Sequence, residues 1–512
     1  MNRGSGIIMH IASLPGKYGI GTFGKEAYKF GDFLKDSGQK YWQILPLGPT
    51  SFGDSPYQSF SAFAGNPYFI DFDILKKEGI LNKEDYEIIN FGKNPEKIDY
   101  AKIFIEKFKV LRKAYENFKM KGNFNDIKKF EEKEAYWLED YALYMALKNH
   151  FKLKNWQTWD EDIRLRKAES VTKYKKILSD EVGYWKFLQF EFYKQWNELK
   201  AYVNRLGIQI IGDMPIYVAE DSADVWSNPE AFLLDKNTLK PLKVAGCPPD
   251  IFSATGQLWG NPIYDWNYME KTNYKWWVAR IKQSLNLYDV LRIDHFKGFE
   301  SYWSIPYGDL TAENGKWVKG PGIKIFNAIK EKLGEVNIIA EDLGTLTEET
   351  IKLRDDTGFP GMKILTFAFD TDSTNPFLPH NYEENFIVYT GTHDNDTVRG
   401  WVETTAPKEQ VKKAVQYLGL NEEEGYNWGF IRGVWGSVAR VAIAQMQDFL
   451  DLGNEARTNL PSTLGSNWCW RMKEDLINNN LAKKIYSITE IYGRCDQKKN
   501  KIAKDKNNLD AN

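Results

Sequence analysis

Acidic residues follow short apolar runs at several places along the sequence, and such carboxylates can act as nucleophiles, acids or bases. The positions are Asp213, Asp294, Glu341, Asp342, Asp370 and Asp394. Any one of them is more often a helix cap or an ion-pair partner than a reactive group, because a charge beside a buried strand is otherwise costly. Gathered in one cleft, like charges raise the pKa of at least one carboxyl group, which then stays protonated beside an ionised neighbour.

Asp294 and Glu341 are the pair best suited to opposite roles. Arg292 stands two residues before Asp294, so on a strand both side chains point the same way and the guanidinium favours an ionised nucleophile. Glu341 has Ile339 at the equivalent position, a less polar setting that raises a carboxyl pKa toward that of a general acid. Retaining glycoside chemistry needs two carboxyl groups about 5–5.5 Å apart. Neighbouring strands lie about 4.8 Å apart, so acids at the tops of two adjacent strands can meet that requirement.

Short apolar runs provide the strands that would position these acids. The runs are IIMHI (7–11), YWQILPL (41–47), IQIIGDMPIYV (208–218), VLRIDHF (290–296), VNIIAEDLG (336–344), KILTFAFD (363–370), FIVYTGTHD (386–394) and VAIAQMQDFL (441–450). Continuous apolar runs are typical of parallel strands buried on both faces, and helical patterns such as 24–37 and 321–333 separate several of them. The sequence therefore predicts an α/β fold, a (β/α)8 TIM barrel with the acids at its mouth. Residues 435–450 could equally form a buried helix, and the alternative of an open doubly wound sheet lacks a Gly-rich phosphate loop.

Two gaps between the runs are too long for simple crossovers. We expect residues 48–207 to form a mostly helical insertion, with a subdomain over about 75–205, and residues 219–289 to form an active-site loop insertion. Both would lie in βα loops of a single catalytic domain spanning residues 1–500. The polar stretch 496–512 is expected to be a disordered tail.

Amino-acid composition indicates which classes of binding partner the sequence disfavours. Lys plus Arg is 68 and Asp plus Glu is 70, a balance that gives no long-range attraction to nucleic acid or to an acidic membrane surface. Three scattered cysteines, no signal-peptide core and no apolar stretch of membrane-spanning length predict a cytoplasmic protein. The 18 Trp, 28 Tyr and 30 Phe residues fit either core packing or stacking on sugar rings, and composition does not separate the two.

Several motifs together resemble those of one family. LRIDHFKG, AEDLG, GTHDN and IGDMPIYV are similar to the four signature regions of the α-amylase clan in the form found in amylomaltases, also called disproportionating enzymes or 4-α-glucanotransferases. Further segments match in order: SLPGKYGIGTFG (13–24), WQILPLGPTSFGDSPYQSFSAFAGNP (42–67), GQLWGNPIYDW (256–266) and LGNEARTNLPSTLGSNWCWR (452–471). The resemblance spans roughly residues 4–471 and implies a compact barrel with no C-terminal β-sandwich.

The resemblance implies a role for each acid. Asp294 would attack the anomeric carbon, Glu341 would protonate the leaving oxygen and later act as base, and Asp394 would hold sugar hydroxyls as the transition state forms. It implies no cofactor and no metal site. The expected reaction moves α-1,4-glucan segments from a donor malto-oligosaccharide, starch or glycogen chain to the 4-hydroxyl of an acceptor, by a retaining double displacement.

The same resemblance implies substrate contacts. Tyr57 would be the platform for the donor sugar, Trp259 the lid over the acceptor side, with Gly256 and Gly260 as hinges. The other expected contacts are Ser55, Asp213, Arg292, His393, Asp370 and Asn467. His295 is as often structural as functional, and Cys469 departs from the larger polar residue that the family usually has there. Aromatic residues of the helical insertion, such as Tyr100, could form a second glucan site.

Two alternatives stay open at this point. The first is an α-glucan hydrolase of the same clan, and the second is a non-catalytic glycan-binding homologue. The expected partners are malto-oligosaccharides and α-1,4-glucans, with no nucleic acid and no membrane, for a monomer or a homodimer. The intact positions Asp294, Glu341 and Asp394 favour an active enzyme.

Overall fold

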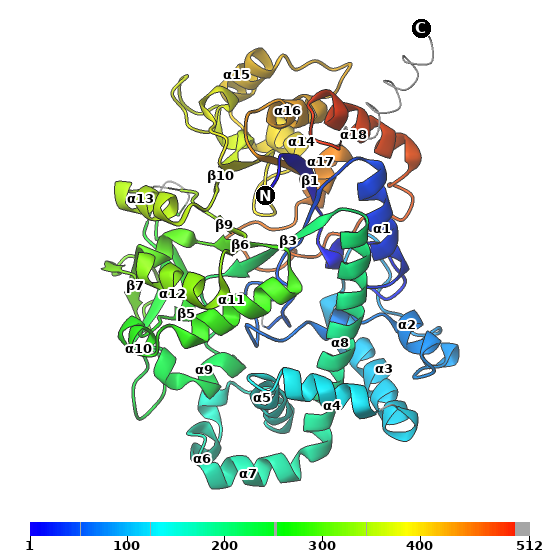
Figure 1. The fold of residues 1–512 in the computed structure, drawn as a ribbon, viewed down its shortest axis with the longest axis vertical. Helices are drawn as coiled ribbons and strands as arrows, with labels where there is room; N and C mark the ends of the chain where they lie inside the picture. Colours follow the sequence, from blue (N-terminus) through cyan, green and yellow to red (C-terminus); the bar gives the residue numbers. More distant parts are fainter. Residues whose placement is uncertain (52, 123, 250–252, 345, 497–512) are drawn as a thin grey trace.

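The central element is a sheet of eight parallel strands. A computed structural model describes residues 1–496 except 52, 123, 250–252 and 345 (Figure 1). In spatial order the strands are β10 (Gly361–Ile364), β11 (Phe386–Tyr389), β12 (Val441–Gln445), β1 (Gly4–Ile8), β2 (Tyr41–Gln43), β3 (Gln209–Pro215), β6 (Val290–Asp294) and β9 (Ile338–Ala340). The amide N of Ala340 donates to the carbonyl O of Pro360 at 2.9 Å, which joins the two end strands and brings the sheet round into a barrel. The predicted barrel is confirmed, and each of the eight apolar runs overlaps one strand, although β1 and β10 begin before their runs.

Some predicted strand ends were wrong. The run 363–370 continues past β10 as a 3₁₀ turn, Leu365–Phe367, so Asp370 lies six residues beyond the strand. Residues 441–450 contain both β12 and a short helix, α17 (Met446–Phe449), which resolves the ambiguity left by the sequence. Asp213 lies inside β3 and is buried there.

Alternate residues of the strands fill the barrel and cover its outside. The inward set forms one cluster drawn from all eight strands, which includes Ile8, Tyr41, Ile211, Val290, Ile339, Met362, Ile387 and Ile443. The intervening residues, such as Ile7, Trp42, Leu291 and Val388, belong to the larger core under the helices. Both faces of each strand are therefore apolar, which explains why the sequence shows continuous runs and no alternation.

Helices follow most of the strands. They are α1 (Lys25–Asp36), α8 (Ser179–Arg205), α11 (Lys275–Leu287), α12 (Ile323–Leu333), α13 (Glu348–Thr357), α15 (Lys408–Leu418), α16 (Tyr426–Trp435) and α18 (Asn479–Ile491), with the short α14 (Val398–Gly400) and a π-helical turn, Trp401–Thr405, before α15. Residues 365–385 contain only two 3₁₀ turns, so the crossover from β10 to β11 has no α-helix.

The segment between β2 and β3 is helical. Its helices are α2 (Phe72–Lys77), α3 (Tyr100–Lys121), α4 (Phe124–Lys133), α5 (Leu138–His150), α6 (Glu161–Arg164), α7 (Ala168–Ile177) and then α8. In Figure 1 they extend below the barrel in blue to blue-green. The 27-residue α8, about 40 Å long, runs from this group of helices back to the barrel and leads into β3.

A second, antiparallel sheet is built from two loops. Its order is β5 (Gln257–Pro262), β4 (Lys243–Cys247), β7 (Ser301–Pro306) and β8 (Lys316–Lys319). The first two strands come from the loop after β3, which also contains α9 (Ala223–Ser227) and α10 (Trp266–Lys271), and the other two follow β6. The sequence did not predict strands here, since they are short and interrupted by Gly and Pro.

The predicted tail 496–512 lies outside the described residues except for Asp496. None of the described helices is long and apolar enough to cross a membrane.

Candidate active site

Asp294, the predicted nucleophile, ends β6, and Glu341, the predicted acid/base, directly follows the neighbouring strand β9. β6 pairs with β9, and Ile293 is in register with Ala340. Asp294 directly follows Ile293 and Glu341 directly follows Ala340, so the two acids stand at equivalent positions. The main chain continues this pairing, because Glu341 N donates to Ile293 O at 3.0 Å and Phe296 N donates to Glu341 O at 3.1 Å. The neighbouring strands therefore place the two carboxylates side by side at the mouth of the barrel.

Arg292 lies between two carboxylates. One of its terminal nitrogens, Nη1, is 2.5 Å from Asp213 Oδ2 and 3.1 Å from Asp294 Oδ1, and its side chain is almost completely buried. Burial raises the pKa of Asp294 to about 6, and Arg292 is the main influence in the opposite direction. The guanidinium thus stabilises the ionised form, as the sequence predicted, but does not cancel the effect of burial.

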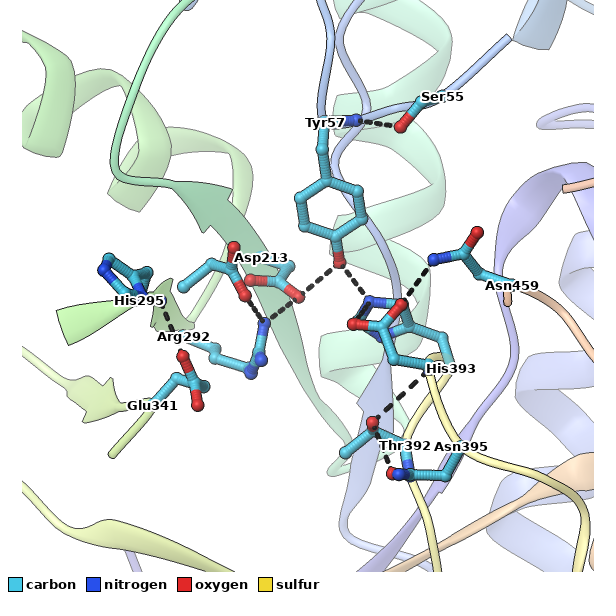
Figure 2. A network of polar contacts seen from close by, with 12 residues as sticks. Ser55, Tyr57, Asp213, Arg292, His295, Glu341, Thr392, His393, Asn395 and Asn459 are labelled. Carbon is cyan, nitrogen blue, oxygen red and sulfur yellow. Dashed lines mark hydrogen bonds and ion pairs between the residues drawn. The ribbon is translucent and has the colours of Figure 1, made fainter. Parts of the chain in front are cut away.

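Glu341 is held by two main-chain donors. His295 N donates to Oε2 at 2.7 Å (Figure 2). Leu343 N donates to Oε1 at 2.9 Å. His295 has a left-handed backbone (φ 54°) directly after β6. Burial and the nearby Asp294 raise the pKa of Glu341 to about 7, against the opposing effect of Arg292. Of the two carboxyl groups, Glu341 therefore keeps its proton to the higher pH.

A chain of polar contacts leads from Asp213 to the third acid. Tyr57 Oη donates to Asp213 Oδ2 at 2.8 Å and lies 2.9 Å from His393 Nε2 (Figure 2). The two rings are stacked, with centroids 5.2 Å apart and an interplanar angle of 16°. His393 Nε2 is also 3.3 Å from Asp394 Oδ2. Burial opposes a charge on His393, but Asp394 outweighs it, so the pKa of His393 is raised.

Asp394 is the most strongly ionised acid of the group. Burial alone would raise its pKa, but His393 and a hydrogen bond from Asn459 lower it to about 2. Asn459 Nδ2 donates to Asp394 Oδ1 at 2.6 Å. The order of these pKa values favours an ionised Asp394, an ionised Asp294 and a protonated Glu341 in the same pH range.

Asp294 and Asp394 line an open cavity of about 750 Å³, a volume that includes space open to solvent. It is lined by Ser55, Tyr57, Gln58, Pro215, Ile216, Tyr217, Gln257, Trp259, Asn261, Asp294, His295, Asp394, Asn459, Pro461 and Trp468. Ser55 Oγ accepts a hydrogen bond from Tyr57 N at 3.2 Å. Aromatic faces beside amide and carboxylate groups suit a ligand that has apolar C–H faces and many hydroxyls, such as a sugar chain.

Trp259 forms one wall of this cavity. It lies on β5, and its ring meets His295 edge-on with centroids 4.8 Å apart. Gly256 and Gly260 have positive φ angles of 69° and 77°, and a Cβ on Gly256 would lie 2.4 Å from Cys247 O. The segment predicted to act as a hinged lid is thus a strand paired with β4, with Gly256 directly before it and Gly260 within it.

Other predicted contacts lie farther from the cavity. Asp370 is exposed and accepts from Asn375 Nδ2 at 2.8 Å. Asn467 contacts Leu460 and Thr463 of its own loop, with no contact to the three acids among the described residues. Asp342 pairs with Arg354 at 2.7 Å, the structural role expected of most strand-end acids.

Sequence reasoning missed two residues of the site. Asn459 lies in the motif LGNEARTNLPSTLGSNWCWR (452–471), and nothing in its residue type distinguishes it from other loop amides. Trp468 lies in the same motif, lines the cavity, and packs against Tyr57 and His393 at 5.6 and 5.9 Å between ring centroids. Its positive φ of 62° is unusual for a bulky residue, a signal that appears only in the structure.

The described part of the chain contains no group of three or more His, Cys, Asp or Glu side chains arranged to hold a metal ion. The site consists of protein acids, one buried arginine, the two histidines His295 and His393, and aromatic walls.

Comparisons with known proteins agree with this chemistry. A family model described as 4-alpha-glucanotransferase matches residues 9–477. A 4-alpha-glucanotransferase from Clostridium butyricum is 66% identical over 488 residues, covering 95% of this chain and 100% of that protein. A 4-alpha-glucanotransferase from Thermus thermophilus is 48% identical over 498 residues, covering 95% and 98%. The structure of the amylomaltase from Streptococcus agalactiae in complex with acarbose superposes with a TM-score of 0.94 at 48% identity, covering 96% and 100%.

Proposed function

Because the chain belongs to the 4-alpha-glucanotransferase family, we propose that Asp294, Glu341 and Asp394 carry out the transfer reaction of that family in this protein. The observation that carries this assignment is the placement of Asp294 and Glu341 on paired strands, with pKa values of about 6 and about 7. A nucleophile must be ionised and a general acid must be protonated in the same pH range.

In the first step, an Asp294 oxygen forms a bond to the anomeric carbon as the glycosidic C–O bond breaks. Glu341 gives its proton to the leaving oxygen, which departs as the shortened glucan. In the second step, Glu341 takes the proton of an acceptor 4-hydroxyl, whose oxygen displaces Asp294 from the anomeric carbon. Two inversions retain the α configuration.

Asp394 and Arg292 act on the sugar and on the nucleophile. Asp394 accepts hydrogen bonds from ring hydroxyls, and such bonds strengthen as positive charge develops on the sugar. Arg292 holds Asp294 and Asp213 together, and Tyr57 offers its ring to the donor sugar. Trp259 and His295 line the opposite wall, where an acceptor sugar can exclude water.

The substrates we propose are malto-oligosaccharides and longer α-1,4-glucans. The relative from Streptococcus agalactiae carries acarbose, an oligosaccharide analogue, and the present cavity has the aromatic and carboxylate walls that such a ligand needs. We also propose that the protein works in the cytoplasm as a monomer or homodimer, without nucleic acid or membrane. Light scattering of the purified protein tests the oligomeric state.

The assignment is tested by the products formed from maltotriose. The wild-type protein should give a ladder of longer and shorter glucans with little new reducing-end formation. D294N should abolish the ladder, by roughly 10⁴-fold or more in rate, because the covalent step loses its nucleophile. Release of glucose and maltose without a ladder would favour the hydrolase alternative, and D294N with full activity would contradict the assignment.

A further inference from the structure

The third acid is held from two sides. His393 approaches Oδ2 of Asp394, and Asn459 donates to Oδ1 at 2.6 Å (Figure 2). His393 is the preceding residue in the chain, whereas Asn459 reaches Asp394 from a loop 65 residues later. The carboxylate therefore depends on a separate segment for half of its hydrogen bonding.

That loop is itself fixed to the main chain around Asp394. Arg457 Nη2 donates to Asp394 O at 2.5 Å, Nη1 lies 2.5 Å from Asp396 Oδ1, and Nε donates to Asn459 O at 2.7 Å. Asn459 N also donates to His393 O at 3.1 Å. One guanidinium and one main-chain bond thus set the position of the amide relative to the carboxylate.

Other contacts of the segment after β11 serve its main chain and its threonines. Asn395 Oδ1 accepts from Thr392 N at 2.8 Å, and Asp448 accepts from Val398 N at 2.8 Å and from Thr390 Oγ1 at 2.6 Å. Within the described residues, Asn459 makes the side-chain amide contact to the Asp394 carboxylate itself.

We propose that Asn459, held in place by Arg457, is a positioning residue that fixes the direction of the Asp394 carboxylate for the transfer step. This inference rests on the proposed function, in which Asp394 contacts the sugar. An amide suits this task because it donates a hydrogen bond without bringing a charge. A misdirected carboxylate would lose hydrogen bonds that are made in the transition state, since a displacement of about 1 Å can cost about 100-fold in rate.

The first test is N459A, with N454A as the matched control. Asn454 is in the same loop and donates to Thr404 Oγ1 at 3.0 Å, away from the acids. N459A should lower kcat about 10- to 100-fold, the equivalent of one hydrogen bond to a charged group, and should leave KM for maltotriose nearly unchanged. N454A should keep wild-type kcat. Equal losses in both variants, or a rise in KM without a loss of kcat, would overturn the proposal.

The second test is the pH profile of N459D. When protonated, an aspartic acid at this position can donate to Asp394 as the amide does; when ionised, it repels Asp394. The ratio of kcat for N459D to kcat for wild type should therefore rise as the pH falls from 8 to 5, whereas the ratio for N459A should stay flat. A flat ratio for N459D would contradict a positioning role through this bond.

A third variant separates the two hypotheses. D394N should be nearly inactive if Asp394 has its proposed role, and adding N459A to D394N should then cause little further loss. Full activity of D394N would refute the proposed function. An inactive D394N together with a fully active N459A would refute only the present inference.

Discussion

At the scale of single residues, Arg292 sets how the acids divide their roles. It touches Asp294 and Asp213 and lies on the strand next to Glu341, yet it forms an ion pair with Asp294 and not with Glu341. A guanidinium keeps its proton even when it is buried. Arg292 therefore stays positively charged and always favours the ionised form of the carboxylates that it contacts. Burial raises the pKa of both groups and Arg292 lowers it in both, so Asp294 stays below Glu341 as an Asp side chain ordinarily lies below a Glu.

This difference predicts a narrow bell-shaped pH profile for kcat/KM. Asp294 must be ionised, so activity is lost as the pH falls through about 6. Glu341 must be protonated, so activity is lost as the pH rises through about 7. Initial rates of transfer from maltotriose between pH 4 and pH 9 measure both limbs, which belong to the coupled pair. A plateau extending from pH 5 to pH 9 would contradict these assignments.

The placement of Asp294 and Glu341 could be predicted from sequence because one ends β6 and the other directly follows β9. Asp394 lies five residues beyond β11, so its prediction depended on the GTHDN motif and not on a strand end. The role of Asn459 could not be predicted, because its contact with Asp394 joins two loops. Such a contact produces no periodic pattern in the sequence. Asp370 shows the opposite error, because an apolar run predicted a strand end where the chain had already turned.

At the scale of elements, the small antiparallel sheet contributes one wall of the cavity beside Asp294. Strand alternation turns Gln257, Trp259 and Asn261 of β5 toward the cavity and Leu258 away from it. The pairing of β4 with β7 also joins the loop after β3 to the loop after β6. Asp294 is the last residue of β6, directly before that second loop. Eight barrel strands were predictable from buried apolar runs, while these four depend on pairing between distant loops.

The position of Trp259 in this wall predicts that W259A weakens acceptor binding selectively. Removing the indole should raise the acceptor KM about tenfold and increase hydrolysis relative to transfer, since burying an aromatic side chain contributes about 1.5–3 kcal/mol. The control is L258A, because Leu258 is 38% exposed on the other face of the same strand. Glucose release and chain-length redistribution are measured in parallel. An equal change in both variants would assign the effect to the strand and not to the cavity wall.

At the scale of the whole molecule, a buried lysine joins the helical insertion to the barrel. Lys148 of α5 lies 2.6 Å from Asp221 in the loop after β3 and donates to Leu153 O and Lys154 O at 3.0 and 2.9 Å. Trp156 Nε1 donates to Glu220 O in the same loop at 2.9 Å. Together with the continuous helix α8, these contacts make the insertion part of the catalytic body and not an appended module.

K148M should therefore destabilise the whole protein, by about 3 kcal/mol, because it leaves Asp221 and two carbonyl groups without their cation. K167M is the matched control, since Lys167 pairs with Asp162 at 2.6 Å but both side chains are more than half exposed. Such a surface pair contributes about 1 kcal/mol or less. Urea unfolding followed by tryptophan fluorescence compares the midpoints, and equal midpoints for the two variants would contradict this prediction.

The pairing of β1 with β12 has a consequence for the order of events during synthesis. Gly4 of β1 is in register with Val441 of β12. One edge of the first barrel strand therefore stays unpaired until the last barrel strand has been made. At about 5–20 residues per second, a ribosome needs roughly 20 to 90 seconds to make the intervening chain. During that interval β1 presents a row of unpaired main-chain groups, and a nascent chain has to be kept from pairing them with another copy. Transfer activity should thus not appear during translation until residues 441–445 have emerged, together with Asn459 and Trp468, which follow them and line the cavity.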